Sequence, residues 1–367
     1  MVAQVNKPES TPDPGTGTGT GSVNTAVGVI ALQLADVEAL RFDEFMAEAL
    51  YGPQGFYSQG GRAGRRGDFI TSPEVGPLFG AVIARAIDEW WRQAGSPTEF
   101  TVIDAGAGPG TLARGVLAAK PDVLVEGALH YVCVEISAAQ RALHPPEVLS
   151  LAEMPHGPIT GVVIANELLD NLPFRLMVFD GGWCESFVRR SLDGQWAEDL
   201  HPVELDWPPA AHGSRAPLQD AAGRWVGDTL DRVVDGRVVV FDYAVARTVM
   251  LAARPWRQWM RTYRGHRPGE HYLRDPGQQD ITAEVAIDQL SVSAGEPDTI
   301  RSQAQWLQLH GIDELVAEGK RIWADQAARP GLEAMKARSR VSEAEALLDP
   351  DGLGNFTVLE WIKRSKA

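Results

Sequence analysis

A carboxylate followed by three closely spaced glycines marks one segment of the 367-residue chain as a candidate ligand site. Asp104 ends Phe100–Asp104, an apolar stretch typical of a buried strand, and Gly106, Gly108 and Gly110 follow it. Glycines at such a turn let the backbone approach a ligand at the carboxyl edge of a parallel sheet. The spacing differs from the G-x-G-x-x-G fingerprint, and an acid precedes it. The turn therefore suits a ligand with positive charge better than a pyrophosphate.

A second acid, Glu135, ends the next expected strand, Leu129–Glu135. A carboxylate in this place can bind both hydroxyls of a ribose, as in other nucleotide-binding folds. Alone, the glycine turn also fits a nicotinamide or flavin site, or a tight turn without a ligand. Together with Asp104 and Glu135 it favours S-adenosylmethionine, whose ammonium and sulfonium groups carry positive charge.

An amide and two carboxylates, Asn166, Glu167 and Asp170, follow the expected strand Ile159–Ala165. The carboxyl ends of parallel strands meet at one edge of the sheet, so this segment should lie beside the glycine turn. Its carboxylates could hold a guanidinium, orient one nitrogen for in-line attack on a methyl group, and accept its proton. We take all three as candidate catalytic residues, with Asn166 also at the cofactor. A helix N-cap with solvated acids is the structural alternative.

A third polar segment, residues 67–74, leads into an expected helix. Ser72 has the residue type of an N-cap, Pro73 suits the first helical position, and Glu74 suits the first turn. Asp68 and Thr71 are less easily explained by helix-start chemistry. The apolar residues that follow predict one continuous helix with a buried face, formed by Val75, Leu78, Phe79, Val82, Ala86 and Trp90.

The order of the expected elements predicts an α/β fold with a doubly wound parallel sheet. Apolar runs rich in Val, Ile, Leu and Phe alternate with helical stretches, as expected for strands covered on both faces. The expected strands are Phe100–Asp104, Leu129–Glu135, Ile159–Ala165, Phe174–Phe179, Arg237–Tyr243 and Phe356–Trp361.

Five segments are expected along the chain. Residues 1–35 include a Pro-, Gly-, Ser- and Thr-rich stretch and form a disordered tail. Residues 36–99 form an N-terminal helical segment that contributes to the cofactor pocket, and residues 100–245 form the core. Residues 246–350 lose the α/β rhythm and become rich in Arg and Trp, which indicates a mostly helical cap. Residues 351–367 return to the sheet as its last strand.

Composition excludes several classes of protein. The 34 Lys and Arg residues against 49 Asp and Glu residues give a formal charge of −15, which argues against nucleic acid or an anionic membrane as partner. We see no membrane span, signal peptide or transit peptide and expect a cytoplasmic protein. Cys133 and Cys184 are expected to be buried thiols, and the scattered histidines predict no metal site.

Six segments, in chain order, resemble the MidA-type family of S-adenosylmethionine-dependent methyltransferases. They are GDFITSPEVGPLFG from residue 67, DAGAGPGTL from 104, ANELLDNLP from 165, FDY from 241, YRGH from 263 and DPGQQDITA from 275. The resemblance runs from about Arg41 to Trp361 and so covers nearly all of the chain. Mitochondrial members of the family methylate an arginine of a respiratory complex I subunit.

The resemblance implies a class I methyltransferase with a Rossmann-like sheet, acting on a protein arginine by direct in-line transfer without a metal. It implies that Asp104, the three glycines and Glu135 hold the cofactor, and that Asn166, Glu167 and Asp170 face the methyl acceptor. It places four further residues in a pocket wall beside the methionine end: Asp68, Thr71, Ser72 and Glu74. Ala244 and Glu284 depart from the family pattern, and we expect both near the substrate.

Two other functions fit the same residues. The segment 246–350 could be shaped around a small-molecule acceptor, such as an amine or hydroxyl of a metabolite, and a deep closed pocket would favour this. Alternatively, the chain is an assembly chaperone or binding module that keeps a cofactor site without turnover. A protein substrate, such as a respiratory complex subunit, predicts an open acidic groove.

Overall fold

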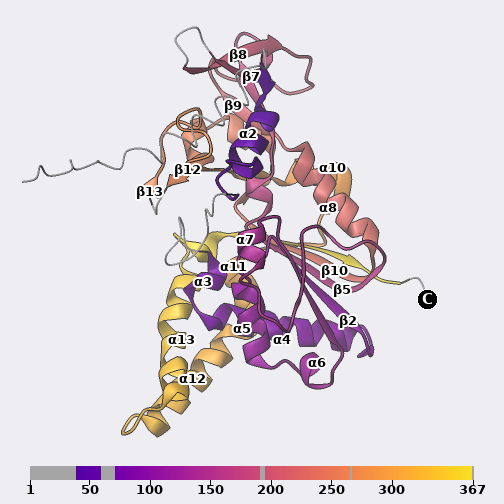
Figure 1. The fold of residues 1–367 in the computed structure, drawn as a ribbon, viewed down its shortest axis with the longest axis vertical. Coiled ribbons are helices and arrows are strands. Elements are labelled where there is room, and N and C mark those ends of the chain that lie inside the picture. Colours follow the sequence, from indigo (N-terminus) through magenta and orange to yellow (C-terminus); the bar gives the residue numbers. More distant parts are fainter. Residues whose placement is uncertain (1–38, 59–70, 191–194, 265–266, 366–367) are drawn as a thin grey trace, which may run out of the picture.

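A seven-stranded sheet lies at the centre of the computed structural model, which describes residues 39–58, 71–190, 195–264 and 267–365 (Figure 1). The expected tail, residues 1–35, lies outside the described residues. The strand order is β16-β17-β10-β5-β2-β3-β4. The strands are β2 (Phe100–Ala105), β3 (Leu129–Val134), β4 (Leu149–Leu151), β5 (Ile159–Asn166), β10 (Val233–Asp242), β16 (Thr299–Ser302) and β17 (Thr357–Lys363).

The directions of these strands confirm the expected α/β architecture. From β4 to β10 every neighbouring pair is parallel, and β17 runs antiparallel to both of its neighbours. Successive residues face opposite cores: Val102 and Val162 contact one, Ile103 and Val163 the other. Because β3 and β4 lie on one side of β2 while β5 and β10 lie on the other, the chain order reverses between β2 and β5. Ligands bind at the carboxyl ends of such a switch point.

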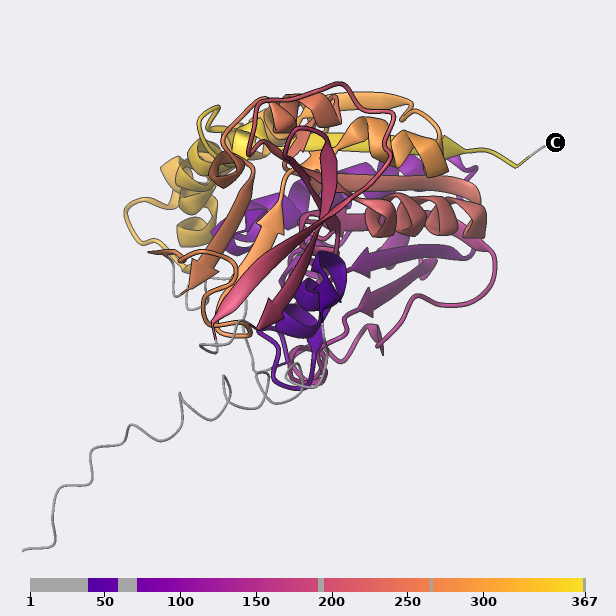
Figure 2. The same cartoon turned by 90° about the horizontal axis from the view of Figure 1, so that it is seen from above.

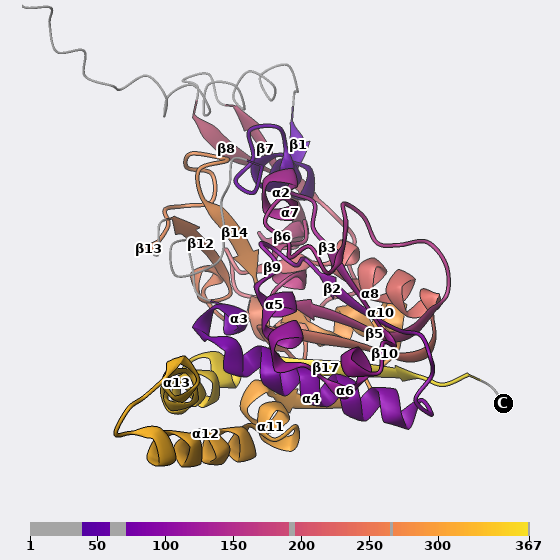
Figure 3. The same cartoon turned by 60° about the horizontal axis from the view of Figure 1, so that its bottom comes forward.

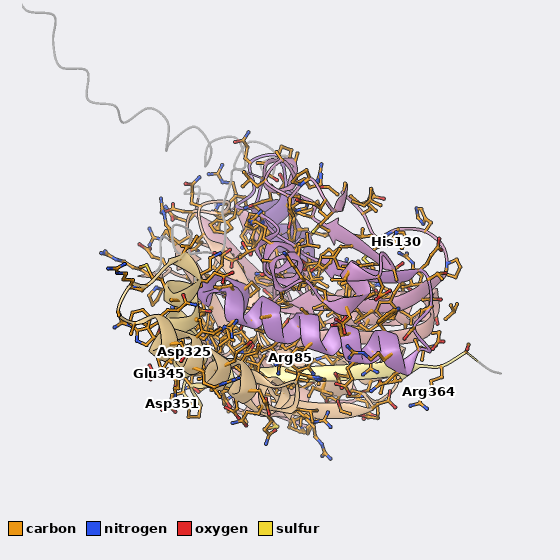
Figure 4. The ribbon with its side chains drawn as sticks, turned by 90° about the horizontal axis from the view of Figure 1, so that it is seen from below. Arg85, His130, Asp325, Glu345, Asp351 and Arg364 are labelled. Atoms are coloured by element: carbon orange, nitrogen blue, oxygen red, sulfur yellow. The ribbon has the colours of Figure 1, made fainter. Side chains whose placement is uncertain are left out.

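Helices cover both faces of this sheet (Figure 3). One face carries α4 (Pro77–Gln93), α5 (Thr111–Ala119), α6 (Asp122–Val125), α11 (Gln303–Leu309), α12 (Ile312–Gln326) and α13 (Leu332–Leu348). The other face carries α8 (Asp220–Arg232) and α10 (Ile287–Ala294). Arg85 on α4 donates a hydrogen bond to the carbonyl of Gly311, which joins α4 to the start of α12 on the outer surface (Figure 4).

A second, antiparallel sheet lies beyond the carboxyl edge of the first (Figures 1 and 2). It consists of β1 (Leu40–Arg41), β6 (Arg175–Phe179), β7 (Trp183–Arg190), β8 (Trp196–Pro202) and β9 (Arg215–Leu218), and α2 (Phe42–Tyr51) packs on it. The prediction that Phe174–Phe179 joins the parallel sheet was wrong, because β6 pairs antiparallel with β7 and β9. Both faces of β6 are buried here too, so its apolar run gave no means of separating the two sheets.

Residues 246–350 do not form one helical cap. Their first part, which directly follows β11 (Ala244–Val245), forms α9 (Thr248–Ala252), η2 (Trp256–Gln258), β12 (Met260–Arg264), β13 (Arg267–Pro268), β14 (Asp280–Ala283) and β15 (Val285–Ala286). These elements lie near the antiparallel sheet, whereas α10, β16 and α11 to α13 belong to the main sheet and its covering helices. Trp259 and Trp306 are buried in these two different cores, so the Trp-rich composition reflects core packing rather than a cap.

The single helix expected from Ser72 is two helices, α3 (Ser72–Val75) and α4. Gly76 is extended between them, because Pro77 disfavours a helical conformation at the residue before it. Thr71 occupies the N-cap of α3, so the prediction of Ser72 as N-cap was wrong. The Ser72 hydroxyl instead donates a hydrogen bond of 2.8 Å to Gln303 Oε1 in the interior.

Three short helices complete the description: α7 (Ala138–Arg141), η1 (Leu169–Asn171) and η3 (Leu353–Asn355). Cys133 and Cys184 are buried free thiols, as predicted. Across the described ranges, no helix has both the length and the apolar character that crossing a membrane requires.

Candidate active site

A cavity of about 500 Å³ opens at the carboxyl ends of β2, β3 and β5, beside the switch point. Its wall includes the glycine turn after β2, the residues after β3, and the segment after β5. Tyr51, Tyr57 and Glu74 add the N-terminal segment to the wall. Residues far apart in the chain therefore meet where an open α/β fold binds its ligand.

The glycine turn has a backbone that other residues adopt only with strain. Gly106, Gly108 and Gly110 have φ values of 69°, 52° and 79°, in the left-handed region. A Cβ on Gly110 would lie 3.1 Å from Pro145 Cδ, whereas a Cβ on Gly108 would meet nothing within 4 Å. Gly108 therefore keeps open a part of the cavity wall that a side chain would fill.

Two acids flank this turn. Glu135 Oε2 accepts a hydrogen bond of 3.0 Å from the Gly108 N–H, and its Oε1 accepts one of 2.8 Å from the Ser137 N–H. The carboxylate is thus fixed at the end of β3 by backbone donors. Asp104, at the end of β2, is 2% exposed, and burial raises its pKa to about 7. A cationic ligand beside Asp104 would favour its ionised form.

Glu167 is strained and half-buried directly after β5. Its φ of 52° is in the left-handed region, which costs a non-glycine residue about 1 kcal/mol or more. Its N–H donates to the Phe241 carbonyl at 2.8 Å, and Asn166 Nδ2 donates to Glu167 Oε1 at 3.2 Å. Burial, with a contribution from the charge of Asp170, raises the pKa of Glu167 to about 8.

Asp170 and Asp242 lie behind Glu167. Asp242 Oδ2 accepts hydrogen bonds from the N–H groups of Leu169 and Asp170, at 2.9 and 3.2 Å, and so fixes η1 against β10. Burial raises the pKa of Asp242 to about 8, and burial followed by the charge of Asp242 raises the pKa of Asp170. Asp170 Oδ1 is buried and makes no hydrogen bond within the described part of the chain. These acids would be stabilised by a cation that entered their surroundings.

The structure brings most of the predicted site residues to this cavity. Its lining includes Thr71, Glu74, Asp104, Gly106, Gly108, Glu135, Asn166 and Glu167. Glu74 Oε1 accepts a hydrogen bond of 2.5 Å from the Thr111 hydroxyl, which ties α3 to α5. Asp170 lies behind the wall, Gly110 at the base of the turn, and the Ser72 side chain points to Gln303. Asp68 lies outside the described residues, and the ligand-binding role of each residue stays a prediction.

Sequence reasoning missed a hydrogen-bonded group that supports η1. The Tyr57 hydroxyl lies 3.1 Å from Asn171 Oδ1 and 3.1 Å from Asp280 Oδ1, and Asn171 Nδ2 donates to the same Asp280 oxygen. Tyr57 and Asp280 are separated by 223 positions. Asp280 and Asp242 belonged to segments noted for their family resemblance, but no local pattern assigned a role to either.

The charge of the lining is one-sided. Its described residues include the carboxylates Glu74, Asp104, Glu135, Glu153 and Glu167, and no Lys, Arg or His. Acceptor oxygens without neighbouring cations fit an ammonium, a sulfonium and ribose hydroxyls far better than a phosphate group. The residues present therefore fit S-adenosylmethionine, and contact of the cofactor with the glycine turn and of its ribose with Glu135 stays a prediction.

Comparison with known proteins agrees with this chemistry. Residues 82–304 match the model of a family described as "Putative S-adenosyl-L-methionine-dependent methyltransferase". The chain belongs to this family, the MidA-type methyltransferases. Its fold is also that of a Burkholderia thailandensis protein crystallised with S-adenosyl-homocysteine, with a TM-score of 0.79 and 25% identity over 98% of this chain and 96% of the other. The cofactor of this methyltransferase is S-adenosylmethionine.

Curated relatives of the methyltransferase carry a more specific name. The Drosophila melanogaster protein arginine methyltransferase NDUFAF7 homolog, mitochondrial, is 29% identical over 66% of this chain and 63% of its own length. The Danio rerio protein arginine methyltransferase NDUFAF7, mitochondrial, is 25% identical over 74% of this chain and 72% of its own. The chain thus spans slightly less than two thirds of the Drosophila relative.

Proposed function

We propose that this methyltransferase transfers the methyl group of S-adenosylmethionine directly to a guanidinium nitrogen of a protein arginine. The observation that carries the proposal is the group of three acids, half-buried Glu167 and buried Asp170 and Asp242, at a cavity whose described lining has no cation. The names of the relatives, protein arginine methyltransferases, support the same acceptor. A guanidinium is planar, always charged and matched to carboxylate oxygens.

The chain's own residues would act by binding and positioning. The glycine turn and Glu135 hold the cofactor, which when bound supplies an electrophilic methyl group. Glu167 and Asp170 hold the guanidinium, and Asn166 restrains the Glu167 carboxylate through its 3.2 Å hydrogen bond. Alignment and exclusion of water then supply most of the rate enhancement.

Proton transfer completes the reaction. An arginine side chain keeps its proton in water, but a nitrogen that gains a methyl group must lose one. An ionised Glu167 is the acceptor for that proton, since its raised pKa of about 8 makes the carboxylate a stronger base than an exposed glutamate. We further propose that the substrate is a respiratory complex subunit. We also propose that this chain acts in the cytoplasm, although the relatives' names include the word mitochondrial.

The proposal is tested by separating cofactor binding from transfer in Glu167→Gln. We expect calorimetry to show S-adenosylhomocysteine binding within about threefold of wild type, while transfer of labelled methyl to protein falls by about 100-fold or more. Glu345→Gln, which removes an exposed acid on α13, is the control for loss of one carboxylate (Figure 4).

Three outcomes would contradict the proposal. If Glu167→Gln transfers methyl groups as fast as the wild type, Glu167 does not have the role proposed for it. Label found only in small molecules would indicate a metabolite acceptor, and cofactor binding without any transfer would indicate a binding module.

A further inference from the structure

A second cavity, of about 550 Å³, lies next to the catalytic acids on the side away from the glycine turn. Its lining includes Tyr243, directly after Asp242 at the carboxyl end of β10, and Phe356, directly before β17. In the sheet, Phe241 on β10 pairs with Asn166 on β5, and the Glu167 N–H donates to the Phe241 carbonyl at 2.8 Å, so Tyr243 follows two residues after this contact. Because β5 and β10 are neighbours in the sheet, the two cavities lie side by side along its carboxyl edge.

The second cavity carries arginines where the first carries acids. Arg254 and Arg261 both line it and share one carboxylate, Glu284: Arg254 Nη2 lies 2.6 Å from Glu284 Oε2, and Arg261 Nη2 lies 3.4 Å from Oε1. Two guanidiniums on one carboxylate leave a net positive charge at this wall. Asp351, an exposed residue after α13 that is labelled in Figure 4, also lines the cavity, and among the described residues it makes no salt bridge with either arginine.

Arg261 keeps donors available. A guanidinium has five N–H donors. Within the described chain, Arg261 uses Nη2 alone, for the Gln258 carbonyl and Glu284, and its guanidinium carbon lies 5.4 Å from the centre of the Tyr243 ring. Its side chain is 36% exposed, so its remaining N–H groups can reach a ligand in the cavity. Tyr243 and Phe356, with ring centres 3.9 Å apart, form an apolar wall beside these donors.

We propose that this second cavity binds an acidic side chain of the methyl-accepting protein, through Arg261 and Arg254, while Glu167 and Asp170 hold the neighbouring arginine. The inference rests on the proposed function and adds sequence specificity to it. Acids beside one cavity and arginines in the next would admit an arginine–acid pair in one orientation and repel the reverse. Ala244 and Glu284, which depart from the family pattern, both line this second cavity, and their place near the substrate stays a prediction.

The test uses short capped glycine peptides with one arginine and one aspartate, placed one to three positions before or after the arginine. Each peptide has a twin with asparagine in place of aspartate. Binding is measured by calorimetry with the full chain, in the presence of saturating S-adenosylhomocysteine, so that no turnover is required. We expect at least one aspartate peptide to bind about tenfold tighter than its twin, as a charge-assisted hydrogen bond predicts.

Arg261→Gln should reduce this preference to within about twofold. Arg257→Gln is the matched control, because Arg257 stacks on Trp256 outside the second cavity and its loss removes the same charge from the chain. The control should keep the preference. Absence of any aspartate preference, or a preference that survives Arg261→Gln, would overturn the proposal.

The outcome for the second cavity is separable from that for the proposed function. If S-adenosylhomocysteine binds and a peptide is methylated without aspartate preference, the acidic subsite is wrong and the methyltransferase assignment stands. If S-adenosylhomocysteine fails to bind, the proposed function is wrong. Binding of the aspartate and asparagine peptides without S-adenosylhomocysteine then still tests whether Arg261 binds an acidic side chain.

Discussion

Glu167 is the residue where backbone strain and a raised carboxyl pKa coincide, so its ionisation has a cost in stability. Its pKa rises from 4.5 to about 8 on folding, so between these values the folded chain holds a proton that the unfolded chain releases. The stability that depends on this proton is fully present below pH 4.5 and is lost as the pH rises through about 8.

We therefore expect Glu167→Gln to match the wild type near pH 5 and to be more stable by on the order of a few kcal/mol near pH 9. Urea denaturation at both pH values measures the difference. Glu345→Gln serves again as the control, because it removes one carboxylate from an exposed helix position. Parallel stability curves for wild type and Glu167→Gln would show that Glu167 is ionised without cost.

At the scale of single elements, alanine substitutions can distinguish the energetic cost of a left-handed backbone from the cost of filling the cavity. Gly108 and Gly127 both have positive φ, and a Cβ on either would meet nothing within 4 Å, but only Gly108 lines the first cavity. We expect Gly108→Ala and Gly127→Ala each to lose about 1 kcal/mol of stability.

Only Gly108→Ala should also weaken S-adenosylhomocysteine binding, by tenfold or more, because its methyl group occupies space at the ligand. Thermal denaturation measures the stability of the two variants, and calorimetry measures their affinity for S-adenosylhomocysteine. Equal affinities in the two variants would mean that the turn does not contact the cofactor.

The same elements show what sequence could predict. Asp104, Glu135 and Asn166 could be placed together because each ends a parallel strand, and parallel strands end at one edge. The apolar run at Phe174–Phe179 could be predicted as a strand but not assigned to a sheet, since burial on both faces occurs in both layers. That Gly76 has no room for a side chain could not be predicted, because the Glu343 carboxylate, far along the chain, occupies the place of a Cβ there.

At the scale of the whole molecule, η1 is fixed between two layers. Asp242 binds it from the main sheet, while Tyr57 and Asp280 bind Asn171 from the layer that contains α2 and β14. The contacts of Asn171 span more than a hundred positions and those of Asp242 more than seventy, so no local pattern could predict them. The position of Asp170 beside Glu167 therefore depends on how the two layers pack.

Tyr57→Phe tests this dependence. Loss of the hydroxyl should cost about 1 kcal/mol of stability and lower kcat three- to tenfold, because η1 is held less firmly. Tyr272→Phe removes a buried hydroxyl that donates to Glu198 within the same layer, away from η1, and should lower stability alone. Denaturation and steady-state kinetics separate the two effects, and an equal fall in kcat for both variants would count against the account.

The most direct test of the central claim is to identify the atom that receives the methyl group. The full chain is incubated with a lysate and S-adenosylmethionine carrying a CD₃ methyl, and mass spectrometry locates the label. We predict CD₃ on the guanidinium of arginine in protein, absent with Glu167→Gln and present with Glu345→Gln. Label on another amino acid, or on metabolites alone, would contradict the assignment of a protein arginine as the acceptor.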